Sequence, residues 1–466
     1  MAKKQVAAPA PAPANRPPYM LIEEIRVQGY KSLVDATIQV RPLTLLAGTN
    51  SSGKSSIMQP LLLIKQTMEA PYQPAGALVL DGAHVQAETA GELVSKLENP
   101  SKQFQLEVKG QNFLNGVASK VMLSVAYEKN ASNFNVAFQH SKYGDYPMVK
   151  LTRDASQDEL KAILVEAQAP RKVYGQRVEE LSGIVRQQNG FIRVAVASNT
   201  AGPAGHLYFS GQVEDAIERL MHIPGLRGKA QRSYVAAAFD NQIKGTFDLY
   251  VAGTVSKWQQ EENNKAIAQL NDYLRRLGLT DSVTAKVKNA NEVELSVSRL
   301  PAGSKGKPRK ADMVNIADVG IGVSQVLPIL VALIAAQEGQ IVYVEQPELH
   351  LHPRAQVAMA ELLAEAANRG VRVIVETHSS LLLLTVQTLV AEAKIKPEDV
   401  ALHWFERDAK GATTVRYEQP DENGAYGEWP EDFGDVEMTA QRAYLDAVKR
   451  RRSKSSSVSK NRPTHE

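Results

Sequence analysis

The chain has 466 residues, a net charge of +3 and no cysteine. Its length allows two or three domains with buried cores, and the missing cysteines exclude disulfides, thiolate metal ligands and a cysteine nucleophile. The small net charge does not by itself indicate nucleic-acid binding. No apolar run approaches the roughly 18–20 residues that span a bilayer, and no signal-peptide core is visible. We therefore expect a soluble, cytoplasmic protein without membrane contact.

Both ends of the chain have compositions that do not support a packed core. Residues 1–18 alternate alanine and proline behind two lysines, and residues 449–466 are basic and serine-rich. We expect both to be disordered tails. The basic run is most simply a solvated segment, with contact to nucleic acid as the alternative. The basic loop at 304–310 is interpreted as solvated in the same way.

The first half of the chain predicts short strands followed by mixed structure. The expected strands are residues 21–27, 36–40, 43–47, 77–80, 104–108 and 121–127, and the expected helices are residues 213–221 and 258–277. The second helix is too short for a long coiled-coil arm.

A glycine-rich loop follows the strand at 43–47. Residues 48–55 read Gly-Thr-Asn-Ser-Ser-Gly-Lys-Ser, and a helix is expected to begin directly after them. In this context the spacing predicts a phosphate-binding loop. Its glycines let backbone N–H groups point at phosphates, Lys54 reaches the β- and γ-phosphates, and the Ser55 hydroxyl binds Mg²⁺. The nucleotide-binding residues predicted here are Gly48, Asn50, Ser51, Ser52, Gly53, Lys54, Ser55 and Ser56.

From residue 316 onward, apolar runs again end in polar residues. A strand at 341–344 leads into Glu345-Gln346-Pro347-Glu348, and a strand at 371–375 leads into Glu376-Thr377-His378-Ser379. An apolar helix is expected at 326–336. Strands joined by helices in this way predict a parallel α/β sheet, in which ligands bind beyond the carboxyl ends of the strands. The phosphate loop, Glu345 and His378 should therefore form one composite site.

Taken together, these motifs resemble a known family. Besides the loop and the two strand-end motifs, residues 25–32, Pro224-Gly225-Leu226-Arg227, residues 232–234 and residues 424–433 contribute to the likeness. The chain resembles the ABC-type ATPases of the RecF and structural-maintenance group, in particular compact AAA-like ATPases related to the overcoming-lysogenization-defect nucleases. The likeness covers most of residues 20–440 and is weakest between 110 and 220. It implies an α/β fold, specifically an ABC-type P-loop ATPase head with a mixed sheet and a helical or mixed insert domain.

The resemblance assigns roles to individual residues. Lys54 and Ser55 match the phosphate lysine and the magnesium serine, Glu345 matches the acidic Mg²⁺ residue that ends the Walker B strand, and His378 matches the histidine that senses the γ-phosphate. Residues 318–325 occupy the place of the signature loop, which contacts the nucleotide of a partner subunit. The signature residues implied are Gly320, Gly322, Ser324 and Gln325, and the implied cofactors are ATP and Mg²⁺.

Two positions depart from the family pattern. Gly320-Ile321-Gly322 has no hydroxyl at the first place, where Ser324 could substitute. Gln346 stands where many relatives have a glutamate as general base, and a glutamine cannot accept the proton of water. Either Glu348 or another group is the base, or hydrolysis is slow and ATP serves as a switch; a deliberate Glu-to-Gln change is a further alternative. The expected catalytic set is Glu345, Gln346, Glu348 and His378.

His350 and His352 alternate as metal ligands can. No third ligand is apparent, so packing and hydrogen bonding after the strand is the favoured interpretation, with metal binding as the alternative.

The resemblance implies the following division of the chain: a tail at 1–18, an ATPase lobe at 19–127, an insert at 128–300, a second ATPase lobe at 301–395, a small C-terminal domain at 396–448 and a basic tail at 449–466. Related nucleases continue past the histidine into an acidic nuclease domain, and no such acidic cluster follows His378 here.

We therefore expect a homodimer or higher homo-oligomer that closes around ATP and controls a separate effector, a nuclease or a toxin, in defence against phage or plasmids. The alternative is a DNA repair ATPase that acts directly on DNA ends or gaps.

Overall fold

A computed structural model of the chain describes residues 19–72, 74–97, 102–114, 117–166, 172–173, 176–177, 181–198, 202–237, 243–299 and 312–427. The two tails expected at 1–18 and 449–466 lie outside the described residues, as does the basic loop at 304–310.

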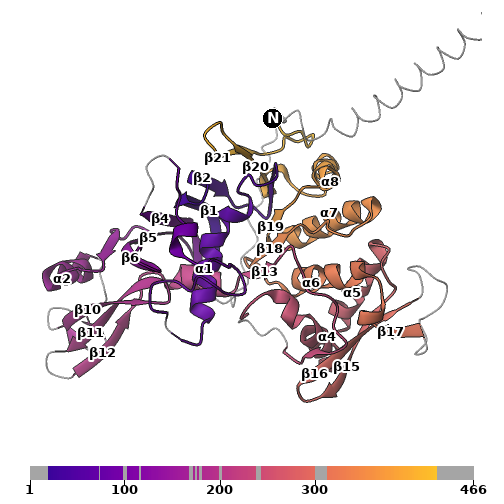
Figure 1. Ribbon diagram of the computed structural model, residues 1–466, viewed down its shortest axis with the longest axis horizontal. Helices are drawn as coiled ribbons and strands as arrows, with labels where there is room; N and C mark the ends of the chain where they lie inside the picture. Colours follow the sequence, from indigo (N-terminus) through magenta and orange to yellow (C-terminus); the bar gives the residue numbers. More distant parts are fainter. Residues whose placement is uncertain are drawn as a thin grey trace, which may run out of the picture.

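A six-stranded sheet forms the centre of the molecule (Figure 1). Its strand order is β13 (Met221–Ile223), β18 (Ile341–Glu345), β19 (Arg372–Glu376), β3 (Leu43–Gly48), β20 (Val400–Arg407) and β21 (Thr413–Glu418). All neighbours pair in parallel except β20 and β21, which are antiparallel. Parallel pairing places the carboxyl ends of β13, β18, β19, β3 and β20 at one edge of the sheet, where ligands bind in this architecture.

Both faces of this sheet are buried, which explains why its strands read as continuous apolar runs. Side chains alternate between the faces because successive residues of a strand point in opposite directions. Val342 and Val344 pack in one core with α6 (Ile321–Ala335), α7 (Pro353–Asn368) and α8 (Ser380–Ala391), whereas Ile341 and Tyr343 pack in a second core with α1 (Gln59–Glu69). Figure 1 shows the helices of these two layers on opposite sides of the sheet.

Some of the helices begin behind a residue whose side chain caps the first turn. The helices are α1 (Gln59–Glu69), α2 (Gln157–Glu166), α3 (Gly211–Glu218), α4 (Val251–Gln260), α5 (Asn264–Arg276), α6 (Ile321–Ala335), α7 (Pro353–Asn368) and α8 (Ser380–Ala391). Pro353 starts α7 behind the N-cap His352, and the Ser379 side chain accepts a hydrogen bond from the amide of Leu382 at the start of α8. These caps fix where the chain turns away from the sheet edge.

A second, antiparallel sheet covers the α1 side. Its strand order is β2 (Leu33–Gln39), β1 (Tyr19–Tyr30), β4 (Gln103–Leu114), β5 (Val117–Lys129), β6 (Phe134–Tyr143) and β7 (Val149–Thr152). Residues of β1 and β4 alternate between buried and more exposed positions, as expected for a sheet with one face on a core. This sheet holds α1, and with it the phosphate loop, against the central sheet.

Smaller sheets complete the described part. They contain β8 (Lys172–Val173), β9 (Gln176–Arg177), β10 (Leu181–Gln188), β11 (Phe191–Ser198), β12 (Gly202–Leu207), β14 (Tyr234–Val235), β15 (Val283–Asn289), β16 (Glu292–Ser298) and β17 (Met313–Asn315).

The structure confirms the expected α/β fold with a mixed sheet and corrects three of its elements. Residues 77–80 form no strand, because the amide of Val79 donates to the Thr67 hydroxyl instead of to a neighbouring strand. The helix expected at 258–277 is two helices, since Asn263 caps a new start by accepting from the amide of Ala266. The helix expected at 213–221 ends at Glu218, and Met221 already belongs to β13.

The division into an insert at 128–300 and a C-terminal domain at 396–448 stays a prediction. Two observations bear on it: β13, from the expected insert, and β20, from the expected C-terminal domain, both pair within the central sheet. Among the described helices, none is both long and apolar enough to cross a membrane.

Candidate functional site

The phosphate loop lies at the carboxyl end of β3 and has glycines where other residues would not fit. Gly48 and Gly53 have φ angles of +139° and +100°. A Cβ atom on Gly48 would lie 2.1 Å from the carbonyl oxygen of Phe405, and one on Gly53 would lie 2.6 Å from Oγ1 of Thr413. The loop therefore needs glycine at both positions for backbone conformation and for space.

Lys54 lies inside the curve of this loop. Its Nζ donates to the carbonyl oxygens of Gly48 at 3.1 Å and Thr49 at 2.7 Å, and the residue is 3 % exposed. Burial lowers the pKa of Lys54, while the nearby carboxylates of Glu376 and Glu348 act in the opposite direction. A positive charge is thus held where a phosphate-binding loop needs one.

The remaining predicted nucleotide-binding residues differ in exposure. Asn50 and Ser51 are exposed, whereas Ser52 is buried. The Oγ of Ser52 has no hydrogen-bond partner within the described part of the chain, which fits a residue that faces a polar ligand. Ser55 and Ser56 are partly buried, and the amide of Ser56 donates to the carbonyl of Gly53 at 3.0 Å.

The β20–β21 hairpin supports the loop from outside, a contact that sequence reasoning missed. Nε of Arg407 donates to the carbonyl of Ser51 at 2.7 Å, and Oγ1 of Thr413 donates to the carbonyl of Ser52 at 2.7 Å. Oγ1 of Thr413 also lies 2.8 Å from the Ser32 hydroxyl, which must be the donor there because one hydroxyl has one proton. No local pattern around Thr413 points to this role.

Glu345 ends β18 with both carboxylate oxygens engaged. Nε2 of His222 lies 3.2 Å from Oε1, and the amide of Gly225 donates to Oε2 at 3.0 Å. Burial favours the neutral carboxyl, but the contact with His222 and the Gly225 amide outweigh it, so the pKa of Glu345 is lowered. Arg227 donates to the main-chain carbonyl of Glu345 at 2.7 Å and to that of Gln325 at 3.1 Å. The segment around Gly225 therefore joins β18 to the start of α6.

A buried chain of polar side chains continues from Glu345. His222 contacts His84 through their Nδ1 atoms at 3.0 Å, Nε2 of His84 lies 3.2 Å from Glu69, and Glu69 pairs with Lys65 at 2.9 Å. Burial lowers the pKa of His84, while its contact with Glu69 acts in the opposite direction. Lys65 is the cation that faces Glu69 at the end of the chain.

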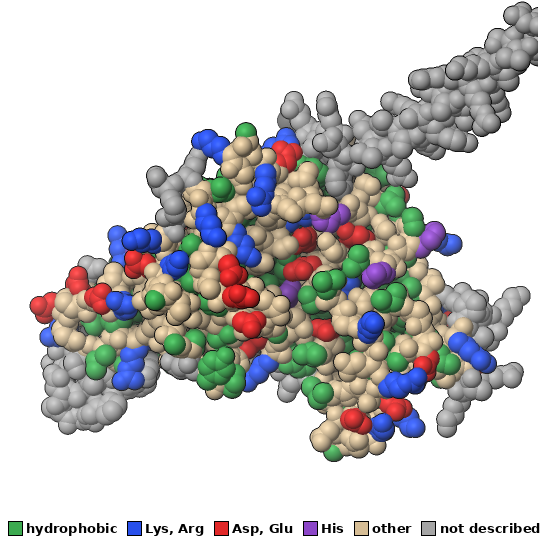
Figure 2. Space-filling view, in the orientation of Figure 1, with side chains coloured by type: hydrophobic (Ala, Val, Ile, Leu, Met, Phe, Trp, Pro, Cys, Tyr) green, Lys and Arg blue, Asp and Glu red, His purple; other side chains and the backbone are tan. Residues whose placement is uncertain are grey.

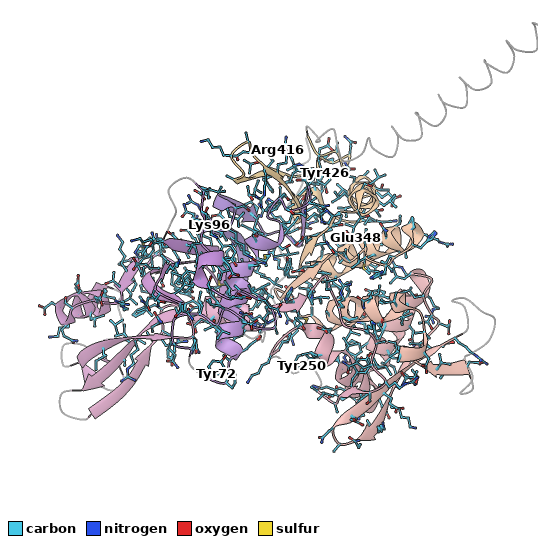
Figure 3. All side chains as sticks on the ribbon, in the orientation of Figure 1. Tyr72, Lys96, Tyr250, Glu348, Arg416 and Tyr426 are labelled. Carbon is cyan, nitrogen blue, oxygen red and sulfur yellow. The ribbon has the colours of Figure 1, made fainter. Side chains whose placement is uncertain are left out.

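Gln346 and Glu348 follow Glu345 at the same edge. Gln346 has a φ of +46°, and its amide donates to the carbonyl of Glu376 at 2.8 Å. Oε1 of Glu348 accepts from the amide of His378 at 2.7 Å, whereas its Oε2 is buried without a partner in the described residues. Burial raises the pKa of Glu348. Figure 3 marks Glu348 near α7 at this edge.

His378 lies beyond β19, half-buried. Burial lowers the pKa of its imidazole and the charge of Lys54 acts in the same direction, so the ring is neutral near pH 7. The loop, Glu345, Gln346, Glu348 and His378 are thus gathered at one edge of the sheet, as the strand pattern predicts. In Figure 2, acidic and histidine side chains gather near the middle of the visible face, where Figure 1 labels β18 and β19.

Glu376 also belongs to this site and was not among the predicted site residues. Its Oε1 accepts from the Ser55 hydroxyl at 2.9 Å, and its Oε2 accepts from the Tyr343 hydroxyl at 3.1 Å. Burial and the nearby charge of Glu345 raise its pKa. The signal was available, because Glu376 ends a buried strand as Glu345 does.

The expected signature loop lies at the N-terminus of α6. Gly320 is exposed, Gly322 is partly buried, and the Ser324 hydroxyl donates to the carbonyl of Ile321 at 2.9 Å. Gln325 is 3 % exposed and donates to the carbonyls of Arg227 and Gly228. This burial argues against the predicted contact of Gln325 with a partner's nucleotide, because its side-chain amide already donates to the backbone within the same subunit.

His350 and His352 follow β18 in the chain and differ in their contacts. His352 accepts from the amide of Arg354 at 3.4 Å, and His350 is exposed with a φ of +66°. Within the described residues, no group of three or more histidine, cysteine or acidic side chains is placed to hold a metal ion. The contact with Arg354 makes His352 the N-cap of α7.

The site fits a nucleotide with Mg²⁺. The loop supplies a buried cation and an unpartnered hydroxyl, and Ser55 and the strand-end glutamates supply the hard oxygen atoms that Mg²⁺ prefers. Because Mg²⁺ keeps several waters and phosphate oxygens as ligands, one or two carboxylates are sufficient.

Two family models match the chain. A model described as "AAA ATPase domain" matches residues 20–180, and one described as "AAA domain, putative AbiEii toxin, Type IV TA system" matches residues 234–384. The first includes the phosphate loop, and the second includes Glu345 and His378. A search of curated proteins finds no match.

Solved structures with a similar course of the chain include heads of structural-maintenance proteins. An Smc head bound to the C-terminal winged-helix domain of ScpA is 13 % identical, with a TM-score of 0.45 over 86 % of this chain and 98 % of that one. The head from Pyrococcus furiosus is 11 % identical, with a TM-score of 0.45 over 86 % and 96 %. The head from Thermotoga maritima is 10 % identical, with a TM-score of 0.38 over 85 % and 98 %. Similarities this low carry no statement about function.

The two family matches fall on the segments that meet at the phosphate loop and at the ends of β18 and β19. Over residues 20–180 and 234–384 the chain is therefore similar to AAA ATPase domains, and these two segments contain the phosphate loop, Glu345 and His378.

Proposed function

We propose that this protein is a slow ATPase that binds ATP with Mg²⁺, dimerises around the nucleotide and thereby controls a separate effector protein. One observation carries the proposal: the phosphate loop and the polar residues that follow β18 and β19 converge at one edge of a parallel sheet. The description of the second family model, which names a putative toxin of a toxin–antitoxin system, supports a role in defence against phage or plasmids.

Each residue of the site has a separate role in ATP hydrolysis. Lys54 binds the β- and γ-phosphates, and Ser55 holds Mg²⁺, which neutralises charge that develops on the phosphates. Gln346 orients the attacking water but cannot accept its proton, and Glu348 is the candidate base. Its raised pKa and its free Oε2 support this role. His378, neutral beside Lys54, senses the γ-phosphate. Turnover is slow because the position after Glu345 has no carboxylate.

Dimerisation is supported by the surface around the signature loop. Ile321 is 51 % exposed, and Leu226, which lies next to Gly225 at the site, is 91 % exposed. Val235 and Leu249, which line a pocket together with Ser324, are 69 % and 55 % exposed. Apolar side chains exposed around one loop are suited to contact with another protein surface. A second copy placed here would bring each signature loop to the nucleotide of the other subunit, in an isologous arrangement.

Direct action on DNA is less consistent with the charges of the described surface. On the antiparallel sheet, Lys109 pairs with Glu24 and Glu107, and Arg26 pairs with Asp35. An ion pair has almost no net charge, so basic side chains that are paired with acids attract DNA phosphates only weakly. An ATPase rate that increases on addition of DNA would favour the repair alternative. A nuclease or toxin gene beside the gene for this chain would favour the effector proposal.

Nucleotide binding is tested with Lys54→Ala. The substitution removes the cation that the loop holds for the phosphates, so ATP affinity should fall to the detection limit of calorimetry. Lys394→Ala is the matched control, because Lys394 is exposed beyond α8 and pairs with Glu392 at the surface. Equal ATP affinity of wild type and Lys54→Ala would refute the proposed function.

A further inference from the structure

The strand order places a different glutamate next to the phosphate loop than the one assigned by resemblance. β19 lies between β18 and β3, so its last residue, Glu376, is one strand from the loop, whereas Glu345 is two strands away. Neighbouring strands are about 4.8 Å apart, so the backbone of Glu345 starts about one strand spacing farther from the loop than the backbone of Glu376 does. The Ser55 hydroxyl accordingly donates to Glu376, at 2.9 Å.

The hydrogen bonds of the two glutamates point to different tasks. Both oxygens of Glu345 face protein groups, since His222 contacts Oε1 and the amide of Gly225 donates to Oε2. Glu376 is held through Oε2 by the Tyr343 hydroxyl at 3.1 Å, which leaves Oε1 turned toward Ser55. A buried carboxylate fixed on one oxygen and directed at the magnesium serine with the other has the geometry of a metal ligand.

The charge of the site agrees with this assignment. Glu376 is 5 % exposed, and a buried carboxylate needs a cation nearby. Lys54 is one such cation, but it is already directed at the carbonyls of the loop. Gln346 is neutral and adds no negative charge at this edge. The acids at the strand ends are Glu345, which ends β18, and Glu376, which ends β19.

We propose that Glu376 is the acidic ligand that, with Ser55, directly coordinates the Mg²⁺ of the bound nucleotide, while Glu345 supports the site through His222 and Gly225. This inference rests on the proposed function, because the metal arrives with the nucleotide. Tyr343 is then a positioning residue that orients the Glu376 carboxylate.

The test uses Mn²⁺ as a paramagnetic probe in place of Mg²⁺. Free Mn²⁺ is measured by electron paramagnetic resonance in the presence of ADP, and ADP affinity without metal is measured by calorimetry in EDTA. Glu376→Gln should weaken Mn²⁺ binding at least tenfold, the loss typical of a damaged metal site, and leave metal-free ADP affinity nearly unchanged. Glu345→Gln is the matched comparison and should weaken Mn²⁺ binding less than Glu376→Gln does.

Two further variants keep the test decisive. Glu376→Asp retains a carboxylate and should recover part of the Mn²⁺ affinity, and Tyr343→Phe removes only the hydroxyl that orients Glu376 and should cause a smaller loss. Wild-type Mn²⁺ affinity in a folded Glu376→Gln variant, or a larger loss in Glu345→Gln, would overturn the inference. A wild-type protein that binds no nucleotide in either assay would instead refute the proposed function.

Discussion

Gln346 shows how one side chain sets the expected rate of the site. Its backbone is fixed, with a φ of +46° and an amide that donates to the carbonyl of Glu376, so Gln346→Glu changes the head group and little else. Because a positioned general base typically contributes 10²–10⁴-fold, single-turnover hydrolysis of ATP should rise on the order of tenfold or more. The measurement is a quenched single-turnover assay.

Glu348→Gln is the control for this prediction. If Gln346→Glu brings no gain and Glu348→Gln abolishes hydrolysis, Glu348 is the base and position 346 only orients water.

His403 links stability to pH at the scale of one residue. It is fully buried in β20 against the backbone of Gln39, and burial lowers its pKa to about 4. The unfolded histidine titrates near 6.5, so its contribution to folding is fully present above that pH and is lost as the pH falls toward 4. His403→Phe removes this loss. Between pH 7 and pH 4.5, wild type should lose about 2 kcal/mol more unfolding free energy than the variant.

Urea unfolding at the two pH values measures this difference. Equal losses in wild type and His403→Phe would contradict the prediction, because the other titrating groups are common to both proteins.

At the scale of elements, the β20–β21 hairpin holds the phosphate loop in shape. Thr413→Val keeps the size of the side chain but leaves the buried carbonyl of Ser52 without its donor, which costs about 1–3 kcal/mol. Because the loop must be ordered to bind phosphates, we expect ATP affinity measured by calorimetry to fall by roughly tenfold or more. Thr414→Val is the matched control, since Thr414 is the next residue of the same strand and is exposed. Equal affinities of the two variants would show that the hairpin does not support the loop.

The buried chain from Glu345 to Lys65 acts at the same scale. It joins the end of β18 to α1, the helix that follows the phosphate loop, through the two histidines. Nζ of Lys65 also donates to the carbonyls of Glu218 and Ile243, so the chain reaches the middle of the sequence. Buried polar contacts thus hold together β18, which ends in Glu345, the helix α1, and the segments around Glu218 and Ile243.

At the scale of the whole molecule, the proposal requires two copies. The described residues contain one phosphate loop and one signature-like loop, and in the proposed dimer the signature loop of one subunit contacts the γ-phosphate bound by the other. We expect ATP with Mg²⁺ to shift the protein from monomer to dimer in sedimentation velocity, because ATP binds the closed state more tightly. Leu226→Glu should prevent the shift without loss of ATP binding, since it places a charge in the exposed apolar surface.

Leu384→Glu is the control for the dimer, because Leu384 is 58 % exposed on α8. A wild-type protein that stays monomeric with ATP and Mg²⁺ while hydrolysing ATP at its full rate would end the dimer proposal.

Much of the site could be predicted from sequence because its parts are local. The spacing of Gly48, Gly53 and Lys54 fixes a loop conformation within eight residues, and an apolar run that ends in Glu345 marks a strand end wherever it lies in the sheet. Parallel pairing then brings such ends to one edge without knowledge of the strand order. The fold class and the strands β1, β2, β3, β4, β5, β18 and β19 follow from the same short-range patterns, whereas β13, β20 and β21 of the central sheet were not predicted.

The tertiary structure alone decided which strand-end residue meets which partner. That Glu376, and not Glu345, receives the Ser55 hydroxyl depends on β19 lying between β18 and β3, and no local pattern encodes the order of strands. Thr413 reaches the loop from a segment 361 residues away, and His84 meets His222 across 138 residues. Contacts of this kind depend on packing between distant segments, which is a property of the whole fold and not of any stretch of the sequence.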